Sequence, residues 1–224
     1  MTSQQTIIRL SKEEIKEIYK FRHQKGVNVG GIFVLERWMN GRFFDGIPDW
    51  VGTSIQAYTD GINNAEVAKR NLDDRAANWI NECDYAQIAQ LGLNTVRLPI
   101  GYWALGDKFP DTPMLPPFNK WTSVYNNTLE QIHTHFKWAQ KYGLGVLLDL
   151  HGAPGSQNGA DHSGNSGNTD LYNSDININT TVNVLRRLTE IFKEYDNMVG
   201  IELLNEPRDH DRLQQLYREA YRQI

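Results

Sequence analysis

Four apolar segments divide the chain into strand-like units. They cover residues 27–35, 94–100, 145–150 and 199–204, and each is almost continuously hydrophobic. Apolar runs of this length are typical of strands that are buried on both faces of a parallel sheet. The last three segments start 51 and 54 residues apart. This spacing leaves room for one loop–helix–loop crossover between neighbouring strands.

Apolar residues at helical spacing fill the intervals between these segments. The predicted helix faces are Ala76, Trp79, Ile80, Cys83 and Ala86; Leu129, Ile132, His133, Phe136 and Ala139; and Val184, Leu188, Ile191, Phe192 and Tyr195. Gly92 and Gly143 stand where helix C-caps are expected, just before the next strand. The alternation of strand and helix predicts an α/β fold with a parallel sheet. The polar stretch 152–175 is expected to be a long loop inside the domain.

Each predicted strand ends in a polar residue that a hydrophobic core would not favour. Glu36 follows the first strand, Arg97 lies in the second, His151 follows the third, and Asn205 and Glu206 end the fourth. The carboxyl ends of parallel strands meet on one side of the sheet, and in α/β folds that side carries the chemistry. We therefore expect these side chains to form one functional site.

The residue types at these strand ends favour glycoside chemistry. Glu206 is a carboxyl at the end of an apolar strand, where partial burial would suit a general acid. Asn205 can bind a sugar hydroxyl, and Arg97 can hold and orient a second carboxylate. His151 adds a hydrogen-bond donor or acceptor. Hydrolysis of a glycosidic bond needs one protonated and one ionised carboxyl, so Glu206 is the candidate acid.

Composition excludes several other classes of protein. The 224 residues carry 23 Lys and Arg against 27 Asp and Glu, so the net charge of −4 does not suit a nucleic-acid clamp. No apolar run approaches the roughly 20 residues of a membrane-spanning helix. The first residues lack the apolar region of a secretory signal, and Cys83 is the only cysteine. Both features predict a cytoplasmic protein.

Four motifs bear a family resemblance. They are residues 26–31 (GVNVGG), 94–103 (NTVRLPIGYW), 149–159 (DLHGAPGSQNG) and 200–207 (GIELLNEP). Through them the sequence resembles glycoside hydrolase family 5, and within it the fungal exo-β-1,3-glucanases. The resemblance implies a (β/α)8 TIM barrel and a retaining hydrolase that needs no cofactor and acts on β-glucan or β-glucosides. It makes Glu206 the acid/base, and it makes Glu36, Arg97, His151, Asp161 and Asn205 substrate-binding residues.

Only about four strands precede the end of the sequence, whereas the resemblance places the nucleophile near the end of the seventh strand. The final helical pattern, residues 213–224, also ends on its apolar face. We therefore expect residues 1–25 to be an extension with a short helix, and residues 26–224 to form the first part of a truncated barrel. The edges of such an open sheet could support association with another chain.

Four departures from the resemblance leave the substrate open. Ala160 replaces a bulky aromatic residue that helps to hold the sugar, Ile32 replaces a tryptophan, Arg37 replaces a proline, and the secretion signal typical of the family is not found. One alternative is an incomplete half-barrel that binds sugar weakly. Another is an intracellular β-glucosidase that acts on glycosides or glycolipids. A metal site at Asp149, His151, Asp161 and His162 is not expected, because the resemblance accounts for Asp149 and His151 without metal.

Overall fold

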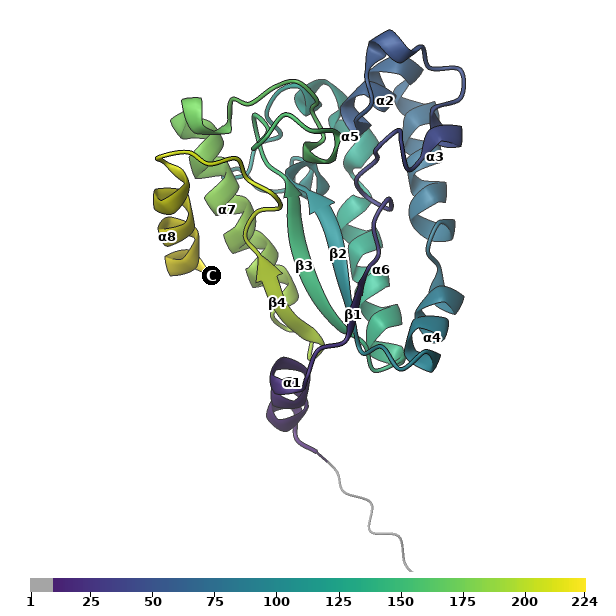
Figure 1. Ribbon diagram of the computed structural model, residues 1–224, viewed down its shortest axis with the longest axis vertical. Helices are drawn as coiled ribbons and strands as arrows, with labels where there is room; N and C mark the ends of the chain where they lie inside the picture. Colours follow the sequence, from purple (N-terminus) through teal and green to yellow (C-terminus); the bar gives the residue numbers. More distant parts are fainter. Residues whose placement is uncertain (1–9) are drawn as a thin grey trace, which may run out of the picture.

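A parallel sheet organises the molecule. The computed structural model describes residues 10–224, and its four strands lie side by side in chain order (Figure 1). The strands are β1 (Gly26–Asn28), β2 (Thr95–Gly101), β3 (Gly145–Gly152) and β4 (Met198–Glu202). Every neighbouring pair is parallel. The predicted α/β fold with a parallel sheet is therefore confirmed.

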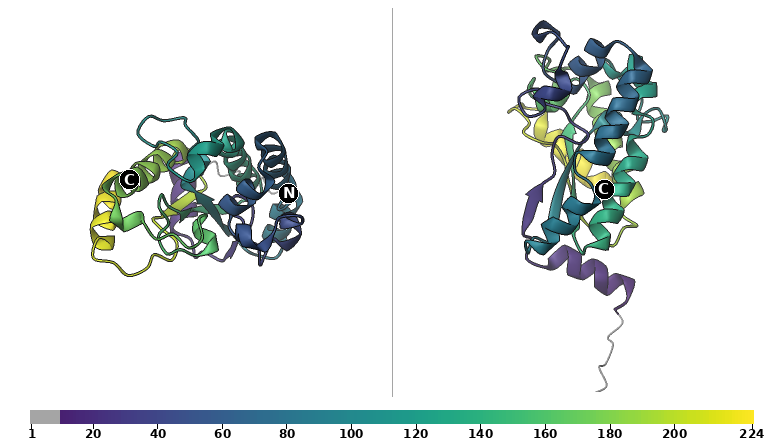
Figure 2. Two further views of the ribbon diagram at one scale, coloured as in Figure 1. Left: turned by 90° about the horizontal axis from the view of Figure 1, so that it is seen from above. Right: turned by 90° about the vertical axis from the view of Figure 1, so that its right-hand side faces the viewer.

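Helices cover one face of this sheet, and the right-hand view of Figure 2 shows β1 and β2 on one side with α3, α4 and α6 on the other. The helices are α1 (Lys12–Phe21), α2 (Ile55–Ile62), α3 (Ala65–Asn78), α4 (Glu82–Gln90), α5 (Thr122–Tyr125), α6 (Thr128–Lys141), α7 (Asp175–Phe192) and α8 (Leu213–Gln223). Gly92 and Gly143 follow α4 and α6 with φ angles of 81° and 69°. These left-handed conformations, which favour glycine, confirm the predicted helix ends.

Side chains alternate between the two faces of β2 and β3. The helix-facing set is almost completely buried and consists of Val96, Leu98, Ile100, Val146, Leu148 and Leu150. Each such side chain contributes about 1.5–3 kcal/mol when it is removed from water. The intervening positions on the other face include Arg97, Asp149 and His151. This alternation fixes the sheet on its helices and places the polar residues together on the opposite face.

The first strand is shorter than predicted. Strand β1 ends at Asn28, although residues 29–35 are equally apolar and mostly buried. The side chains of Arg75 and Trp79 donate hydrogen bonds to the carbonyl oxygens of Gly31 (2.5 Å) and Gly30 (3.1 Å). Gly31 also has a φ angle of 73°, which does not fit a strand. The segment therefore leaves the sheet and packs into the core as an irregular coil.

The helix predicted through residues 76–86 is wrong, because the structure has two helices there. Helix α3 ends at Asn78, and Asn81 begins α4 as its N-cap. The Asn81 side chain accepts from the backbone N–H of Cys83 (2.9 Å), and the Asp84 side chain accepts from that of Asn81 (2.8 Å). This reciprocal cap starts a new helix. Cys83 therefore lies on the exposed surface instead of on a buried face.

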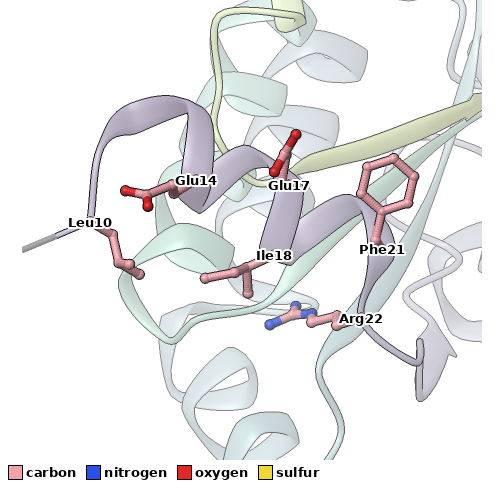
Figure 3. A pocket seen from close by; sticks show the side chains of 6 residues that line it. All are labelled: Leu10, Glu14, Glu17, Ile18, Phe21 and Arg22. Carbon is pink, nitrogen blue, oxygen red and sulfur yellow. The ribbon is translucent and has the colours of Figure 1, made fainter. Parts of the chain in front are cut away.

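Helix α1 lies at the amino-terminal end of the strands, opposite the end that carries the loops (Figure 1). Its residues lie within the extension expected for residues 1–25, and that division of the chain remains a prediction. Figure 3 shows a shallow hollow along α1 that is lined by Leu10, Glu14, Glu17, Ile18, Phe21 and Arg22. None of the helices within residues 10–224 combines the length and hydrophobicity that a membrane crossing requires.

Candidate active site

Arg97 is the centre of a polar network on the open face of the sheet. Its guanidinium donates two hydrogen bonds to the Glu202 carboxylate, from Nε (2.7 Å) and from Nη2 (2.9 Å). Nη2 also lies 2.9 Å from Oδ2 of Asp149, and Nη1 donates to the Asn28 side chain (3.1 Å). One residue from each of the four strands thus takes part in this network. The forked guanidinium suits this arrangement because it offers five donors in one plane.

The charged groups in this network shift one another's pKa values. Burial would lower the pKa of Arg97, but the hydrogen bond to Glu202 and the charge of Asp149 raise it above its usual value. Asp149 is completely buried, and this burial raises the pKa of its carboxyl despite the opposing effects of His151 and Arg97. Glu202 is paired with the Arg97 guanidinium, which fits the role of a structural charge in this network.

Asn205 follows β4 and is held in one orientation by Arg97. Its Oδ1 accepts a hydrogen bond from Nη2 of Arg97 (2.8 Å), so the amide nitrogen points the other way. That Nδ2 is buried and has no hydrogen-bond partner among the described residues. A buried amide donor without a partner is costly, and a ligand oxygen at this position would satisfy it.

His151 is fixed from two sides at the end of β3. Its Nδ1 lies 2.5 Å from Oδ2 of Asp149, and its backbone carbonyl accepts from the buried side chain of Gln157 (2.8 Å). Gln157 also donates to the backbone carbonyl of Asn205 (3.0 Å). The loop after β3 is therefore hydrogen-bonded to the loop after β4. Gln157 lies in the motif at residues 149–159, but its residue type alone gave no sign of this role.

Glu206 stands at the rim of the network, beyond the end of β4. Its side chain is 72% exposed, so the expected partial burial is not found within residues 10–224. Its φ angle of 42° is left-handed, which is uncommon for a residue with a side chain. Asn158 stabilises this turn by donating to the Glu206 carbonyl (2.8 Å). Because the side chain extends from the turn into solvent, its carboxyl can approach a bound molecule.

Glu36 and Asp161 lie in loops at the same end of the sheet. Glu36 pairs with Ser54 in an isolated antiparallel bridge, and its Oε2 accepts from the indole of Trp38 (2.9 Å). It lies eight residues after β1, instead of directly at a strand end. Asp161 accepts hydrogen bonds from the hydroxyls of Thr53 and Ser166.

His162, which the sequence offered only as a candidate metal ligand, lies between these separate groups. Its Nε2 lies 3.5 Å from Oε2 of Glu206, and its ring centroid lies 5.4 Å from that of His151. The charges of Glu206, Glu36 and Asp161 all act on this ring. The structure therefore brings the six predicted site residues to one end of the sheet, with direct contact between Arg97 and Asn205. No cluster within residues 10–224 gathers three His, Cys, Asp or Glu side chains that could hold a metal ion.

The comparison with known families identifies the chain. The family model described as "Cellulase (glycosyl hydrolase family 5)" matches residues 59–224, which is most of the sequence. The chain belongs to glycosyl hydrolase family 5. The resemblance inferred from the four motifs is therefore confirmed, and so is the assignment to the (β/α)8 barrel fold with about four βα units present.

Relatives of this family 5 chain are named as glucosidases. It is 40% identical to the glucan 1,3-beta-glucosidase of Blumeria graminis over 90% of its length, and 36% identical to the probable glucan 1,3-beta-glucosidase A of Aspergillus terreus over 96%. The chain covers 45% and 50% of these two proteins, so it spans about half the length of the curated relatives that it matches.

A solved structure shares the fold of the family 5 chain. The rutinosidase from Aspergillus niger superposes with a TM-score of 0.66 at 20% sequence identity. The match covers 88% of this chain and 52% of the rutinosidase. At this identity the likeness concerns the fold alone, and it agrees with the four parallel strands and their helices.

Proposed function

We propose that this chain supplies the acid/base carboxyl and part of the sugar-binding site of a retaining O-glycosyl hydrolase that acts on β-glucosidic linkages. The observation that carries the proposal is the pair formed by Asn205 and Glu206 at the end of β4. Asn205 offers a buried amide donor that lacks a partner among the described residues, and Glu206 beside it presents an exposed carboxyl. The names of the relatives support a β-1,3-glucan or a related β-glucoside as the substrate.

Glu206 acts as the general acid and then as the general base. It gives a proton to the leaving oxygen, and in the second step it takes a proton from the water that releases the sugar. Asn205 donates to a sugar hydroxyl, and Arg97 keeps the amide in the orientation that this bond needs. The chemistry of these steps uses only carboxyl groups and water, and no cofactor enters the proposal.

The nucleophile is a second carboxyl about 5–5.5 Å from the first in a retaining enzyme. Asp149 and Glu202 are paired with Arg97, below the rim of the sheet. Glu36 and Asp161 accept hydrogen bonds from their own loops. None of these four carboxylates is both free and opposite Glu206. We therefore assign the nucleophile to a segment outside the described residues.

Glu36 and Asp161 are proposed to bind hydroxyls of the terminal sugar. Both carboxylates are already oriented by neighbouring side chains, which lowers the entropy lost when a sugar binds. The indole of Trp38 donates to Glu36 and is largely exposed, so its flat face can stack on a sugar ring. Ala160, directly before Asp161, adds no bulky side chain that could stack on a sugar.

A cytoplasmic location is a further part of the proposal. The thiol of Cys83 is free and exposed, and such a thiol persists most readily in a reducing compartment. A fluorescent fusion of the full coding sequence, observed in living cells, tests this assignment. Fluorescence confined to the secretory pathway contradicts it.

The acid role of Glu206 is tested by the substitution Glu206→Gln in the protein at the full length that its gene encodes. Glutamine keeps the shape but cannot donate the proton, so hydrolysis of unactivated β-glucosides should fall by about 10²–10⁴-fold. Glucosides with very good leaving groups need no protonation, and their glycosylation step should be affected much less. The matched control is Glu17→Gln, a carboxylate on α1 at the other end of the sheet. Equal losses with both kinds of substrate would contradict the proposed role.

A further inference from the structure

The tautomer of His162 can be assigned from the hydrogen bonds of Asn158. The Oδ1 of Asn158 accepts from the backbone N–H of Ala160 (2.9 Å), and its Nδ2 donates to the backbone carbonyl of Glu206 (2.8 Å). Exchanging the two amide atoms would place donor against donor and acceptor against acceptor, so the orientation is fixed. The same Nδ2 lies 2.7 Å from Nε2 of His162. Nε2 must therefore be an acceptor, and the hydrogen of the neutral ring lies on Nδ1.

This tautomer determines how His162 meets Glu206. Nε2 is the ring atom that faces the Glu206 carboxyl, at 3.5 Å from Oε2. While Nε2 accepts from Asn158, it carries no hydrogen and cannot donate one to Glu206. When the ring gains a proton on Nε2, it can no longer accept from Asn158, and the new N–H faces the carboxylate. The two partners of Nε2 thus exclude one another.

We propose that His162 is a positioning residue for Glu206 that works in two states. In the neutral state His162 is bound to Asn158 and leaves the Glu206 carboxyl free to serve the substrate. In the protonated state it releases Asn158 and holds the carboxylate in an ion pair. The inference rests on the proposed role of Glu206 and adds a regulating partner to that residue.

The surroundings of the ring favour the neutral state near neutral pH. Burial lowers the pKa of His162, and the neighbouring His151 lowers it further, whereas the carboxylates of Glu206, Glu36 and Asp161 raise it. The net direction is below the usual value for histidine. These groups come from η5 (Asp161–Ser163), from β3 and from the loops that follow β1 and β4. Acidification therefore converts His162 to the protonated state, which holds the Glu206 carboxylate in an ion pair.

The test is nitrogen-15 NMR of the imidazole rings across a pH titration of the whole chain, with His162→Asn used to assign the His162 signals. Above the midpoint, Nε2 should lack a hydrogen and Nδ1 should carry one. The tautomer itself is measured on the unaltered chain, and the measurement needs no turnover. A neutral ring with its hydrogen on Nε2 overturns the proposal, whereas absent hydrolysis would count only against the proposed function.

Two variants should move the His162 midpoint in opposite directions. Glu206→Gln removes a charge that favours the protonated ring, so the midpoint should fall. Asn158→Ala removes a donor that binds only the neutral ring, so the midpoint should rise. Glu17→Gln is the matched control and should leave the midpoint unchanged. Opposite shifts show that the two partners of Nε2 favour opposite protonation states, and shifts in the same direction overturn the proposal.

Discussion

The substitution Arg97→Met should expose how strongly the central cation stabilises the site. Methionine preserves much of the side-chain volume but removes every donor of the guanidinium. Asp149 and Glu202 then lose their shared counter-charge, and the Oδ1 of Asn205 loses its donor. The loss differs from an ordinary surface truncation because the carboxylate of Asp149 has no access to solvent.

The magnitude follows from the burial of the two carboxylates. Breaking a buried ion pair by removing one partner costs about 3–5 kcal/mol, because a charge is left without compensation. Glu202 is 32% exposed and can recruit water, whereas Asp149 keeps, among residues 10–224, only its contact with His151. We therefore expect the free energy of unfolding to fall by about 3 kcal/mol, near the lower end of that range.

The cost should also depend on pH. Burial already raises the pKa of Asp149 in the folded protein, and the loss of Arg97 removes an effect that lowers it. The folded variant therefore binds a proton that the unfolded chain, with an ordinary aspartate, does not bind over the same range. Stability then falls as pH rises through that range, and acidification restores part of it. The destabilisation should accordingly be largest at neutral pH and smaller in acid.

Urea unfolding of the chain, followed by circular dichroism at several pH values, measures this prediction. The control is Lys12→Met, which removes a cation from an exposed pair with Glu194 and should cost about 0–1 kcal/mol. A loss for Arg97→Met no greater than that of the control would refute the reasoning about buried charge. A loss that does not vary with pH would refute the part assigned to Asp149.

Three further predictions concern stability and association. Burial lowers the pKa of His135 to about 4, so the folded chain should lose about 3 kcal/mol as pH falls from about 6.5 to 4, and urea titrations should show a smaller loss in His135→Gln. Gly31→Ala should destabilise more than Gly46→Ala in thermal unfolding, because both have left-handed φ angles but only Gly31 has side chains within 3.4 Å of an added Cβ. The 224-residue chain should associate through the edges of β1 and β4 in analytical ultracentrifugation, and it should not hydrolyse aryl β-glucosides. Clean turnover by a monomer would contradict the assignment of the nucleophile.

The parts of the fold that depend on long-range periodicity could be predicted from the sequence. Strands β2, β3 and β4 and the helices between them follow from apolar runs and helical spacing, because burial against a whole layer dominates their energetics. The errors arose where a few polar contacts override that pattern. Arg75 donates a hydrogen bond to the carbonyl of Gly31, and Trp79 donates one to the carbonyl of Gly30. The cap at Asn81 divides a continuous apolar stripe into two helices.

The candidate site divides in a similar way. His151 and Asn205 could be proposed from their places at strand ends, since topology alone brings those ends together, and Arg97 could be proposed as a charge within an apolar strand. The partners of Arg97 could not be deduced, because which carboxylate reaches a guanidinium depends on register and side-chain direction. Gln157 and Asn158 were visible only as part of a motif. Their function comes from the path of a long loop, which periodicity does not describe.

The left-handed turn at Glu206 shows how the long loop after β3 positions a residue that follows a strand. A non-glycine residue with a φ angle of 42° costs about 1–3 kcal/mol, and it persists only where its surroundings hold it. Gln157 and Asn158 provide this restraint by binding the carbonyls of Asn205 and Glu206. The loop after β3 therefore determines where the Glu206 carboxyl stands, and through Asn158 it also determines which atom of His162 faces that carboxyl. One amide side chain thus couples the geometry of the proposed acid to the protonation of its neighbour.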